Sequence, residues 1–409
     1  MLKIGMIGAG FVATFHERAL RSVRNAELAG ICALKGADVL AQKAREDHLG
    51  DTKVYGTIAE LVQAVDVVCV FAPNFVRVDM MRQIAAAVED GAKIKGIIVE
   101  KPLARNFAEA DTLARIVKAM GVPTAYFENQ IHMPSVVQAR TQLAQVEKAM
   151  GAAHLARSAE EHGGPHEPWF WNPTTQGGGV CCDMGCHSIA CGMYMVTPAG
   201  KPLTHLKPLS VNATMALLKW GKEPWRSQLQ KRGVDYSKTP AEDYSSVSIE
   251  FEDPDTKHHS IIQATNSWMY DAPGLRLLME TFGPGYSYTV NSLQSPAGMF
   301  ISDVAAAAVS DSELALEKSQ ATRGSLILQP DEASLYGYVS EWIDALTAFE
   351  QGRDALLNLE YGKLITMLIM AAYMSHEKRK VVDLTDPKTL AEIETYVPLI
   401  QQGKGGQVL

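Results

Sequence analysis

The sequence has no long hydrophobic run, no run of basic residues and no C-x-x-C cysteine pair. A membrane-spanning helix needs about 18 or more consecutive apolar residues, and no such stretch occurs in this chain of 409 residues. The formal net charge is −8, and aromatic residues are not interleaved with basic ones. That pattern argues against nucleic acid as a ligand. We therefore expect neither a membrane nor a nucleic acid as a partner.

Cysteine is scarce, with six residues in the whole chain, and free buried thiols are typical of a reducing compartment. The first residues run directly into a predicted strand, which leaves no room for a signal peptide. We therefore expect a cytoplasmic protein. Four of the cysteines surround His187, but their spacing lacks the paired-ligand pattern of zinc sites, so no metal is expected. The six are Cys32, Cys69, Cys181, Cys182, Cys186 and Cys191.

Apolar strand patterns alternate with helical patterns up to about residue 130, an order that predicts a parallel sheet. From His154 onward, longer segments such as 244–251, 260–268 and 275–282 predict a mixed, mostly antiparallel sheet. The length and the 47% hydrophobic content allow two cores. We expect an α/β fold with an N-terminal Rossmann doubly wound parallel sheet at residues 1–131. A C-terminal α+β domain with a large open mixed sheet would follow at 132–409, its last helices packing back on the first domain.

A glycine-rich turn, Gly8-Ala9-Gly10-Phe11-Val12-Ala13, stands between the first predicted strand and a helical stretch. In this G-x-G-x-x-A pattern, Gly8 allows the tight turn and Gly10 lets a pyrophosphate approach the backbone. The start of the helix supplies amide donors for the phosphates. The pattern predicts a dinucleotide site that includes Phe11 and Val12. The alternative is a simple tight turn.

The residues after the second strand bear on the choice of coenzyme. An NAD site usually has an acid there, bonded to the ribose hydroxyls. Here Ala33 and Lys35 fill that place, and the nearest acid is Asp38. A missing acid beside a cation favours the 2′-phosphate of NADP, whereas backbone groups and Asp38 can still hold NAD. We therefore predict NAD or NADP as the coenzyme, with these three residues near its ribose.

Two further strands end in polar residues at rigid turns, Ala72-Pro73-Asn74 and Glu100-Lys101-Pro102. A lysine at the carboxyl end of a parallel strand faces the crevice where doubly wound sheets bind ligands. Proline stops the strand because it has no amide proton for the ladder. Asn74 could bond the nicotinamide ribose or carboxamide, or form an Asx turn with its own backbone. For Glu100, the alternative is a strand-end salt bridge.

A third segment begins with Gly177-Gly178-Gly179 and continues to Asp183 and His187. If Asp183 opens a helix, the two side chains share one face and can meet one substrate. Such a helix would run to about Val196 and stop before a proline. An aspartate at a helix start is otherwise a cap. Together with the glycine run, these residues predict a catalytic histidine.

The loop 159–171 is rich in aromatic, histidine and glutamate residues and leads into this segment. Ring faces suit stacking on the apolar side of a sugar, and the polar side chains suit its hydroxyls. We predict that the loop lines the substrate pocket; the alternative is a buried aromatic corner. The candidate residues are Glu161, His162, His166, Trp169 and Trp171. Residues 220–243 are predicted to be a lid or a subunit arm, and 303–323 a surface helix.

These motifs resemble those of the Gfo/Idh/MocA oxidoreductases over nearly the whole chain. The matching motifs are the glycine turn, Pro73-Asn74, Glu100-Lys101-Pro102, Glu128-Asn129 and the glycine run followed by Asp183-x-Gly185-x-His187. The resemblance implies a catalytic site of Lys101, Asp183 and His187, coenzyme contacts from Asn129, and a homodimer or homotetramer. Two departures stand out: Ala33 replaces the usual acid, and Arg77 stands where the family often has histidine.

The expected activity is hydride transfer between NAD(P) and a secondary hydroxyl of a sugar, cyclitol or glycoside. His187 would be the base, Asp183 would orient it or a substrate hydroxyl, and Lys101 would stabilise the alkoxide. In some members of the family the lysine is given the base role instead. The alternative is an NAD-dependent glycosidase that works by transient oxidation, elimination, hydration and reduction, with Glu160 to His166 serving the extra proton transfers. A ligand sensor on the same scaffold would be expected to lack the lysine or the histidine.

Overall fold

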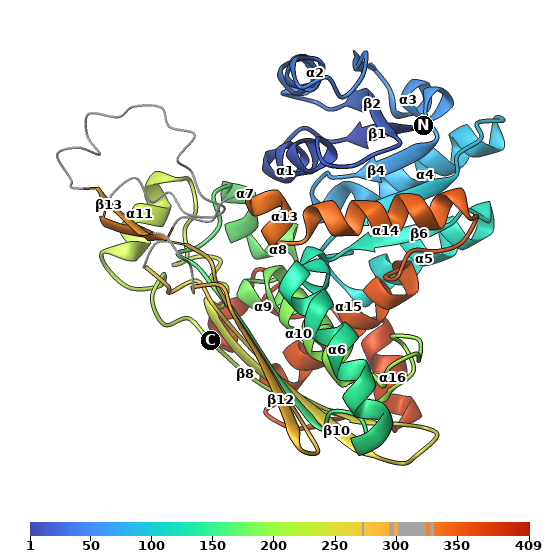
Figure 1. Ribbon diagram of the computed structural model, residues 1–409. Helices are drawn as coiled ribbons and strands as arrows, with labels where there is room; N and C mark the ends of the chain where they lie inside the picture. The colour runs from blue at the N-terminus through green and yellow to red at the C-terminus, as the bar shows by residue number, and fades with distance from the viewer. Residues whose placement is uncertain (272–273, 294–297, 302–323, 328–330) are drawn as a thin grey trace. The chain divides into compact units, whose positions relative to one another are not determined.

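The computed structural model describes residues 1–271, 274–293, 298–301, 324–327 and 331–409 (Figure 1). Its chain forms two compact units, and it passes from one to the other after residues 134, 332 and 366. Unit 1 comprises Met1–Pro134 and Ala333–Thr366, and unit 2 comprises Ser135–Glu332 and Met367–Leu409. The sequence analysis instead predicts a single boundary after residue 131. The helix predicted at 303–323 lies outside the described residues.

Unit 1 is built on a six-stranded parallel sheet with the strand order β3-β2-β1-β4-β5-β6 (Figure 1). This is the Rossmann doubly wound order, so the predicted fold of this part is confirmed. The strand order reverses between β1 and β4, and ligands of such sheets bind at the carboxyl ends of the strands near that point. The strands are β1 Leu2–Ile7, β2 Ala26–Cys32, β3 Lys53–Val54, β4 Val67–Val70, β5 Gly96–Glu100 and β6 Thr124–Phe127.

Every residue of β4, β5 and β6 is buried, as expected when helices cover both faces of a parallel sheet. Local signals start the helices: Thr57 and Glu60 form a capping box at α3, and the Asn106 side chain caps α5. Helix α14 packs against α1 and β6. The helices of unit 1 are α1 Phe11–Leu20, α2 Ala37–Glu46, α3 Ile58–Ala64, α4 Arg77–Glu89, α5 Phe107–Met120 and α14 Tyr338–Glu350, with short 3-10 turns η1 Asn74–Val76 and η2 Asn129–His132.

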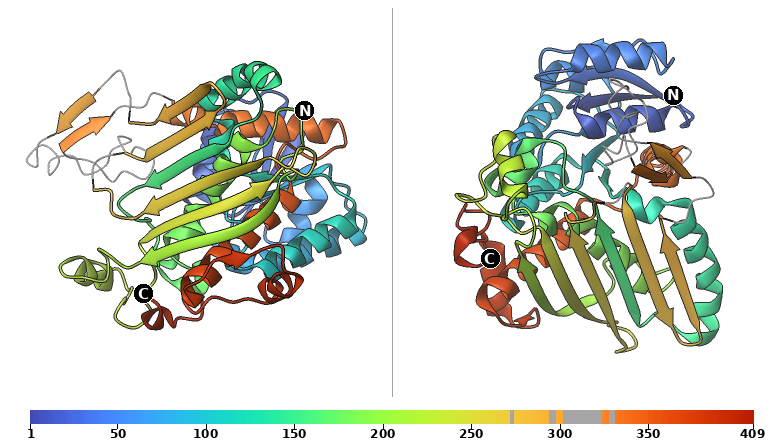
Figure 2. Two further views of the ribbon diagram at one scale, coloured as in Figure 1. Left: turned by 90° about the horizontal axis from the view of Figure 1, so that it is seen from below. Right: turned by 90° about the vertical axis from the view of Figure 1, so that its left-hand side faces the viewer.

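Unit 2 contains a seven-stranded sheet with the order β12-β11-β7-β10-β9-β8-β15 (Figure 2). Strands β7 and β10 run parallel, and the other neighbours described in this sheet run antiparallel. The predicted mixed, mostly antiparallel sheet is therefore confirmed. The strands are β7 Leu155–Glu161, β8 Lys207–Ala216, β9 Tyr244–Glu252, β10 His259–Ser267, β11 Arg276–Gly283, β12 Tyr286–Asn291 and β15 Val382–Asp383, and β13 Gly298–Ile301 pairs separately with β14 Gly324–Ile327.

One face of this sheet is buried: along β9 and β11 every second residue is buried, the period of a strand. Helix α10 packs on β7 and β10 and is buried along its whole length. The bounds of the helices in this part are α7 Pro168–Trp171, α8 Pro173–Gln176, α9 Val180–Asp183, α10 Gly185–Val196, α11 Trp225–Lys231 and α16 Pro387–Glu394, while α6 Pro134–Met150, α13 Glu332–Leu335 and α15 Leu359–Lys378 contain unit boundaries.

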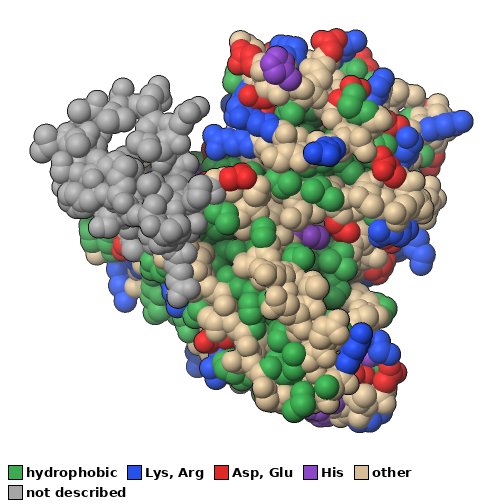
Figure 3. Space-filling model, in the orientation of Figure 1, with side chains coloured by type: hydrophobic (Ala, Val, Ile, Leu, Met, Phe, Trp, Pro, Cys, Tyr) green, Lys and Arg blue, Asp and Glu red, His purple; other side chains and the backbone are tan. Residues whose placement is uncertain are grey.

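Residues 220–243, predicted as a lid or an arm, pack on unit 2. The Trp220 indole N–H donates to the Trp268 carbonyl at 2.7 Å, and Leu229 and Tyr236 are buried. Among the helices in the described parts of the chain, none is both long and apolar enough to cross a membrane. On the face drawn in Figure 3, acidic and basic side chains are interspersed over unit 1.

Candidate active site

The glycine turn of unit 1 has the geometry of a phosphate-binding loop. Gly8 has a φ of 116°, and a Cβ atom on it would lie 2.8 Å from the carbonyl carbon of Phe71, so only glycine fits. A Cβ atom on Gly10, by contrast, would meet no described atom within 4 Å. Within the described residues, no side chain caps α1, which begins at Phe11. The turn therefore offers open backbone and amide donors at a helix start, which fit a pyrophosphate.

The loop after β2 lies beside this turn. Gly36, with a φ of 77°, approaches the carbonyl of Ala9 so closely that an added Cβ would lie 3.3 Å from its oxygen. Ala33 is half-buried, while Lys35 and Asp38 are exposed, the latter in the first turn of α2. One cation and one carboxylate are thus available here, which is compatible with either coenzyme.

The Glu100-Lys101-Pro102 motif follows β5 and is anchored through Glu100. His16 Nε2 lies 2.9 Å from Glu100 Oε1, and the Trp342 indole N–H donates to His16 Nδ1 at 3.1 Å. Because Nδ1 accepts, Nε2 must carry the ring proton and donate to the carboxylate. The Glu341 carboxylate also comes within 4.8 Å, but both ring nitrogens of His16 are engaged, so we assign no metal here. The sequence prediction of a salt bridge to a neighbour missed this partner from α1.

Arg77 holds the backbone around the same motif. Its buried guanidinium donates through Nε to the Ala72 carbonyl at 2.9 Å and through one terminal nitrogen to the carbonyls of Glu100, Pro102 and Leu103. The guanidinium therefore joins the turn after β4 to the turn after β5. A histidine has only two ring nitrogens and could not make this set of bonds. The departure noted at position 77 thus has a structural role in the backbone of the site.

The other predicted coenzyme residues of unit 1 follow neighbouring parallel strands. Asn74 is buried in η1, directly after the strand-end residues Ala72 and Pro73. Lys101 is half-buried, and its backbone N–H donates to the Phe127 carbonyl. Asn129, in η2, donates through its side-chain amide to the Tyr336 carbonyl at 2.7 Å. Because carboxyl ends of parallel strands meet at one edge, the structure gathers these residues at the same edge as the glycine turn.

In unit 2, Asp183 and His187 lie on two consecutive helices. Asp183 ends the short helix α9, Met184 forms the joint, and His187 lies in the first turn of α10. The expectation that Asp183 opens a helix was wrong. The first turn forms earlier, at Val180, because the backbone amides there are bonded to Glu242. The predicted end of the helix at Val196 is confirmed.

The carboxylate of Glu160 lies close to the His187 ring. Its Oε2 lies 3.9 Å from His187 Nε2, and both side chains are buried. This distance is longer than a hydrogen bond, so the carboxylate attracts the ring by charge when His187 is protonated. Asn266 of β10 donates to the Met184 carbonyl at 3.3 Å and to Ser188 Oγ at 2.7 Å, which ties the joint to the sheet. Sequence reasoning did not assign these roles, because Glu160 and Asn266 lie on strands whose pairing the pattern does not reveal.

The aromatic loop divides into a buried and a half-buried part. Trp171 is fully buried against Trp220 and Trp268, and its indole N–H donates to the Pro165 carbonyl at 3.0 Å. This is the buried aromatic corner that the sequence analysis considered as the alternative for the loop. Trp169 is half-buried and lies against Phe170, with 3.8 Å between the ring centroids.

The polar residues of this loop also differ in their burial and in their partners. Glu161 is held by Arg276 at 2.6 Å and by Ser267 at 3.2 Å, so its carboxylate belongs to the sheet. His162 is buried, and its Nδ1 accepts from the Gly164 backbone N–H at 2.9 Å. His166 is half-buried. Of this set, Trp169 and His166 are half-buried and have side chains suited to a sugar, while the half-buried Glu161 is bonded to Arg276.

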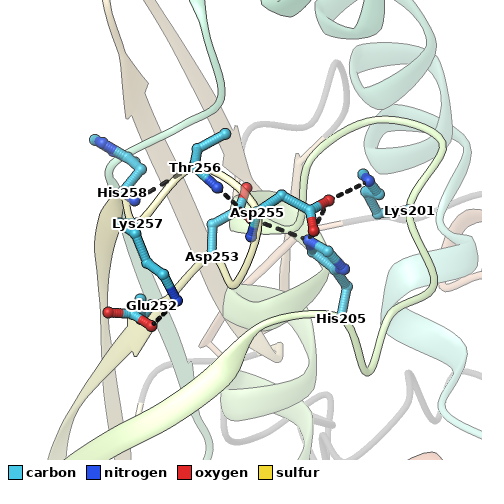
Figure 4. Close-up of polar contacts among 8 residues, drawn as sticks. All are labelled: Lys201, His205, Glu252, Asp253, Asp255, Thr256, Lys257 and His258. Carbon is cyan, nitrogen blue, oxygen red and sulfur yellow. Dashed lines mark hydrogen bonds and ion pairs between the residues drawn. The ribbon is translucent and has the colours of Figure 1, made fainter.

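A separate cluster lies at the turn between β9 and β10 (Figure 4). His205 Nε2 lies 3.1 Å from Asp253 and 3.8 Å from Asp255, and the three side chains could each offer one metal ligand. The Lys201 ammonium, however, lies 2.5 Å from the same Asp255 oxygen. A positive charge therefore already balances the cluster, and we assign no metal to it.

Comparison with known proteins relates the N-terminal part of this chain to a family of oxidoreductases. Residues 2–127 match the family model GFO_IDH_MocA, described as "Oxidoreductase family, NAD-binding Rossmann fold". The chain is 32% identical over 124 residues to glucose-6-phosphate 3-dehydrogenase of Bacillus subtilis, covering 30% of this chain and 32% of that protein. It is 28% identical over 202 residues to D-glucoside 3-dehydrogenase of Escherichia coli, covering 48% of this chain and 54% of that protein. The matches thus span about a third to a half of these curated relatives.

Solved structures match over almost the full length. GenD2 from gentamicin A biosynthesis, in complex with NAD, superposes with a TM-score of 0.73 at 23% identity, covering 94% of this chain and 96% of that one. A putative myo-inositol dehydrogenase from Sinorhizobium meliloti 1021 gives 0.68 at 19% identity, covering 94% and 100%. At these identities the likeness establishes the fold alone. The match to the Gfo/Idh/MocA oxidoreductase family model covers the Rossmann sheet and its glycine turn, at residues 2–127, and the solved structures extend the likeness in fold to almost the whole chain.

Proposed function

We propose that this chain is an NAD(P)-dependent dehydrogenase that transfers a hydride between the nicotinamide and a secondary hydroxyl of a sugar, cyclitol or glycoside. The observation that carries the proposal is Lys101, whose amine follows β5 at the ligand-binding edge of an NAD-binding Rossmann sheet. The names of two relatives support the substrate class, because they place the reaction at position 3 of glucose 6-phosphate and of a D-glucoside.

The coenzyme would be held by the residues at the sheet edge of unit 1. Gly8 and Gly10 would receive the pyrophosphate, Lys35 and Asp38 would lie near the adenosine ribose, and Asn74 near the nicotinamide ribose. A bound nicotinamide supplies the hydride acceptor and donor, and the protein supplies position and field.

The proton chemistry would fall to three side chains. His187 would take the hydroxyl proton, because a neutral imidazole accepts a proton near pH 7. The Glu160 carboxylate, 3.9 Å from His187 Nε2, would attract the imidazolium that forms. The Lys101 ammonium would donate a hydrogen bond to the reacting oxygen and stabilise its negative charge. Asp183 would bind a neighbouring substrate hydroxyl.

A substrate panel tests this proposal. Glucose 6-phosphate, methyl and p-nitrophenyl D-glucosides, myo-inositol and levoglucosan are each incubated with NAD and with NADP. Reduced coenzyme is followed at 340 nm, and released p-nitrophenol is followed separately. We expect reduced coenzyme to accumulate with at least one sugar or cyclitol, and no aglycone. Release of aglycone without net reduction would replace the dehydrogenase with the glycosidase, and no reaction with any member would overturn the proposal.

A further inference from the structure

A single buried residue, Glu242, holds the start of the segment that carries Asp183 and His187. Its Oε1 atom accepts from the backbone N–H of Gly179 at 2.9 Å and of Cys181 at 3.0 Å. Its own carbonyl accepts from the N–H of Val180 at 3.0 Å. Three consecutive amides, at the first turn of α9, are therefore bonded to this residue.

Tyr373 completes the arrangement from α15. Its hydroxyl donates to Glu242 Oε1 at 2.6 Å and accepts from the Gly179 N–H at 3.3 Å. A Cβ atom on Gly178 would lie 1.9 Å from this hydroxyl oxygen, and one on Gly179 would lie 2.1 Å from the Glu242 carbonyl oxygen. The glycine run thus has a specific structural reason: two of its members must lie directly against Tyr373 and Glu242.

Helix α9 needs this external support. It has four residues, and a helix of that length does not form by itself, because nucleation is unfavourable. Its amides at the N-terminal end receive a carboxylate, the charge that the helix dipole favours there. At the far end, Asn266 holds the Met184 carbonyl at 3.3 Å. The orientation of Asp183 and His187 therefore depends on Glu242 at one end and Asn266 at the other.

We propose that Glu242, assisted by Tyr373, is a positioning residue for the catalytic segment, setting where Asp183 and His187 point. The inference rests on the proposed function, since it takes these two residues as catalytic. It is independent of which sugar is the substrate.

The energetics of the carboxyl support a role beyond packing. Burial raises the pKa of Glu242 to about 7, while the donated hydrogen bonds from Tyr373 and the backbone act to lower that pKa. Burial also raises the pKa of Tyr373 and of Tyr236, and in both cases the nearby Glu242 carboxylate adds to the effect. Burying a carboxyl in such surroundings lowers the free energy of unfolding. The presence of Glu242 is therefore better explained by the backbone amides it binds than by a contribution to stability.

The next residue in the chain provides a matched control. Asp243 is as fully buried as Glu242, and its carboxylate likewise accepts from backbone amides. Those amides belong to Leu218, Lys219 and Trp220, at 2.7, 2.8 and 2.7 Å. Two adjacent buried carboxylates thus hold two different segments, and only one of these contains the proposed catalytic residues.

Hydrogen exchange measured by mass spectrometry tests the contact itself without a substrate. In the full-length Glu242→Ala protein, we expect amides of a peptide covering 177–187 to exchange at least about 10-fold faster, because their acceptor is lost. In Asp243→Ala the acceleration should appear in a peptide covering 217–221 instead. Glu242→Gln keeps an oxygen at the Oε1 position and should restore most of the protection. Unchanged exchange at 177–187 in soluble, folded Glu242→Ala protein would overturn the proposal.

Kinetics then test whether the contact acts through His187, using the best substrate of the panel. We expect Glu242→Ala to lower kcat about 100-fold, the effect of a misplacement of about 1 Å, with the KM for NAD unchanged. In a His187→Ala background the same substitution should change kcat less than about 3-fold, because the group it positions is gone. An equal loss in both backgrounds would mean a general structural effect and would reject the positioning role.

If His187→Ala itself keeps full kcat, the proposed catalytic role fails, while the exchange experiment still tests the contact. If Glu242→Ala does not fold, Tyr373→Phe replaces it in both experiments, with smaller effects in the same direction.

Discussion

His16 Nε2 donates to Glu100 Oε1 across 2.9 Å inside unit 1, linking the first helix to the strand that precedes Lys101, the proposed catalytic lysine. His16→Ala would leave a buried carboxylate without this donor, and we expect the free energy of unfolding to fall by about 2–4 kcal/mol. Trp342→Phe removes only the donor to His16 Nδ1, and its cost should be nearer to 1 kcal/mol. Urea unfolding of the parent protein and of the two variants measures both losses of free energy. Equal stability of His16→Ala and the parent would show that Glu100 has another sufficient donor.

Lys101→Met tests the electrostatic role of the lysine. The substitution keeps the length of the side chain and removes the ammonium, so we expect NADH affinity to stay within about 3-fold and kcat to fall at least about 100-fold. Lys95→Met is the matched control, because Lys95 precedes the same strand and pairs with Asp66 at 3.3 Å on the surface. Near-full kcat in Lys101→Met would refute the role given to this lysine. NADH fluorescence titration and initial rates measure the two quantities.

His187→Ala should remove the low-pH limb of the profile of kcat/KM against pH, because that limb reports protonation of the free enzyme's base. Glu160→Gln should keep the limb but move it to lower pH, since the imidazolium loses the carboxylate 3.9 Å from its Nε2. His205→Ala, a histidine of the β9–β10 turn cluster, should leave the profile unchanged. Persistence of the limb in His187→Ala would place the base elsewhere, with Lys101 as the next candidate.

Arg77→Lys tests the guanidinium that joins the turns after β4 and β5. A lysine presents a single ammonium and cannot reach the Ala72 and Glu100 carbonyls together. We expect the free energy of unfolding to fall by about 2–3 kcal/mol and the Kd for NADH to rise about 10-fold. Arg82→Lys, an exposed residue on the same helix paired with Asp79, should change the free energy by less than about 0.5 kcal/mol. Unaltered NADH binding in Arg77→Lys would show that the coenzyme does not depend on these turns.

The raised pKa of Glu242, about 7, predicts a pH-dependent stability. Between about pH 4.5 and 7 the folded protein holds a proton that the unfolded chain has released, so the unfolding free energy falls as the pH rises through this window. The fall from this one group is about 3 kcal/mol and ends above pH 7. Glu242→Gln cannot ionise and should lose this component, whereas Tyr373→Phe should extend it to higher pH because a donor that lowers the pKa is gone. Urea midpoints at pH 5, 6, 7 and 8 measure the slopes, and identical slopes in the parent and Glu242→Gln would contradict the prediction.

The Rossmann sheet could be predicted from the sequence because the patterns that indicate it are only a few residues long. Gly8 and Gly10 follow an apolar strand and precede a helix, and Lys101 follows another apolar strand directly, so periodicity and turn chemistry are enough to place them. Helix α5, Phe107–Met120, likewise has local signals at both ends, because Asn106 caps it and Gly121 follows it.

The same reasoning failed where a distant side chain decides the local conformation. Asp183 has the chemistry of a helix cap, but it ends α9 because Glu242 holds the amides of the preceding turn. Trp171 has the chemistry of a sugar platform, but neighbouring rings bury it completely. The partners of Arg77 and of His187 were also missed, because a carbonyl acceptor has no sequence signature and Glu160 is one of many acidic residues.

The order of residues alone therefore determined the class of fold and the strand-end positions of the proposed coenzyme motifs, and it indicated the family resemblance, since each of these depends on patterns a few residues long. Tertiary structure decided which groups support them. His16 bonds to Glu100, Arg77 bonds to the backbone of two turns, and Glu242 bonds to the backbone of the glycine run. Apart from the bond of Arg77 to Ala72, which spans 5 positions, these contacts join residues 23 to 84 positions apart. They exist because packing excludes water from buried polar atoms, which must then find partners within the fold rather than along the chain.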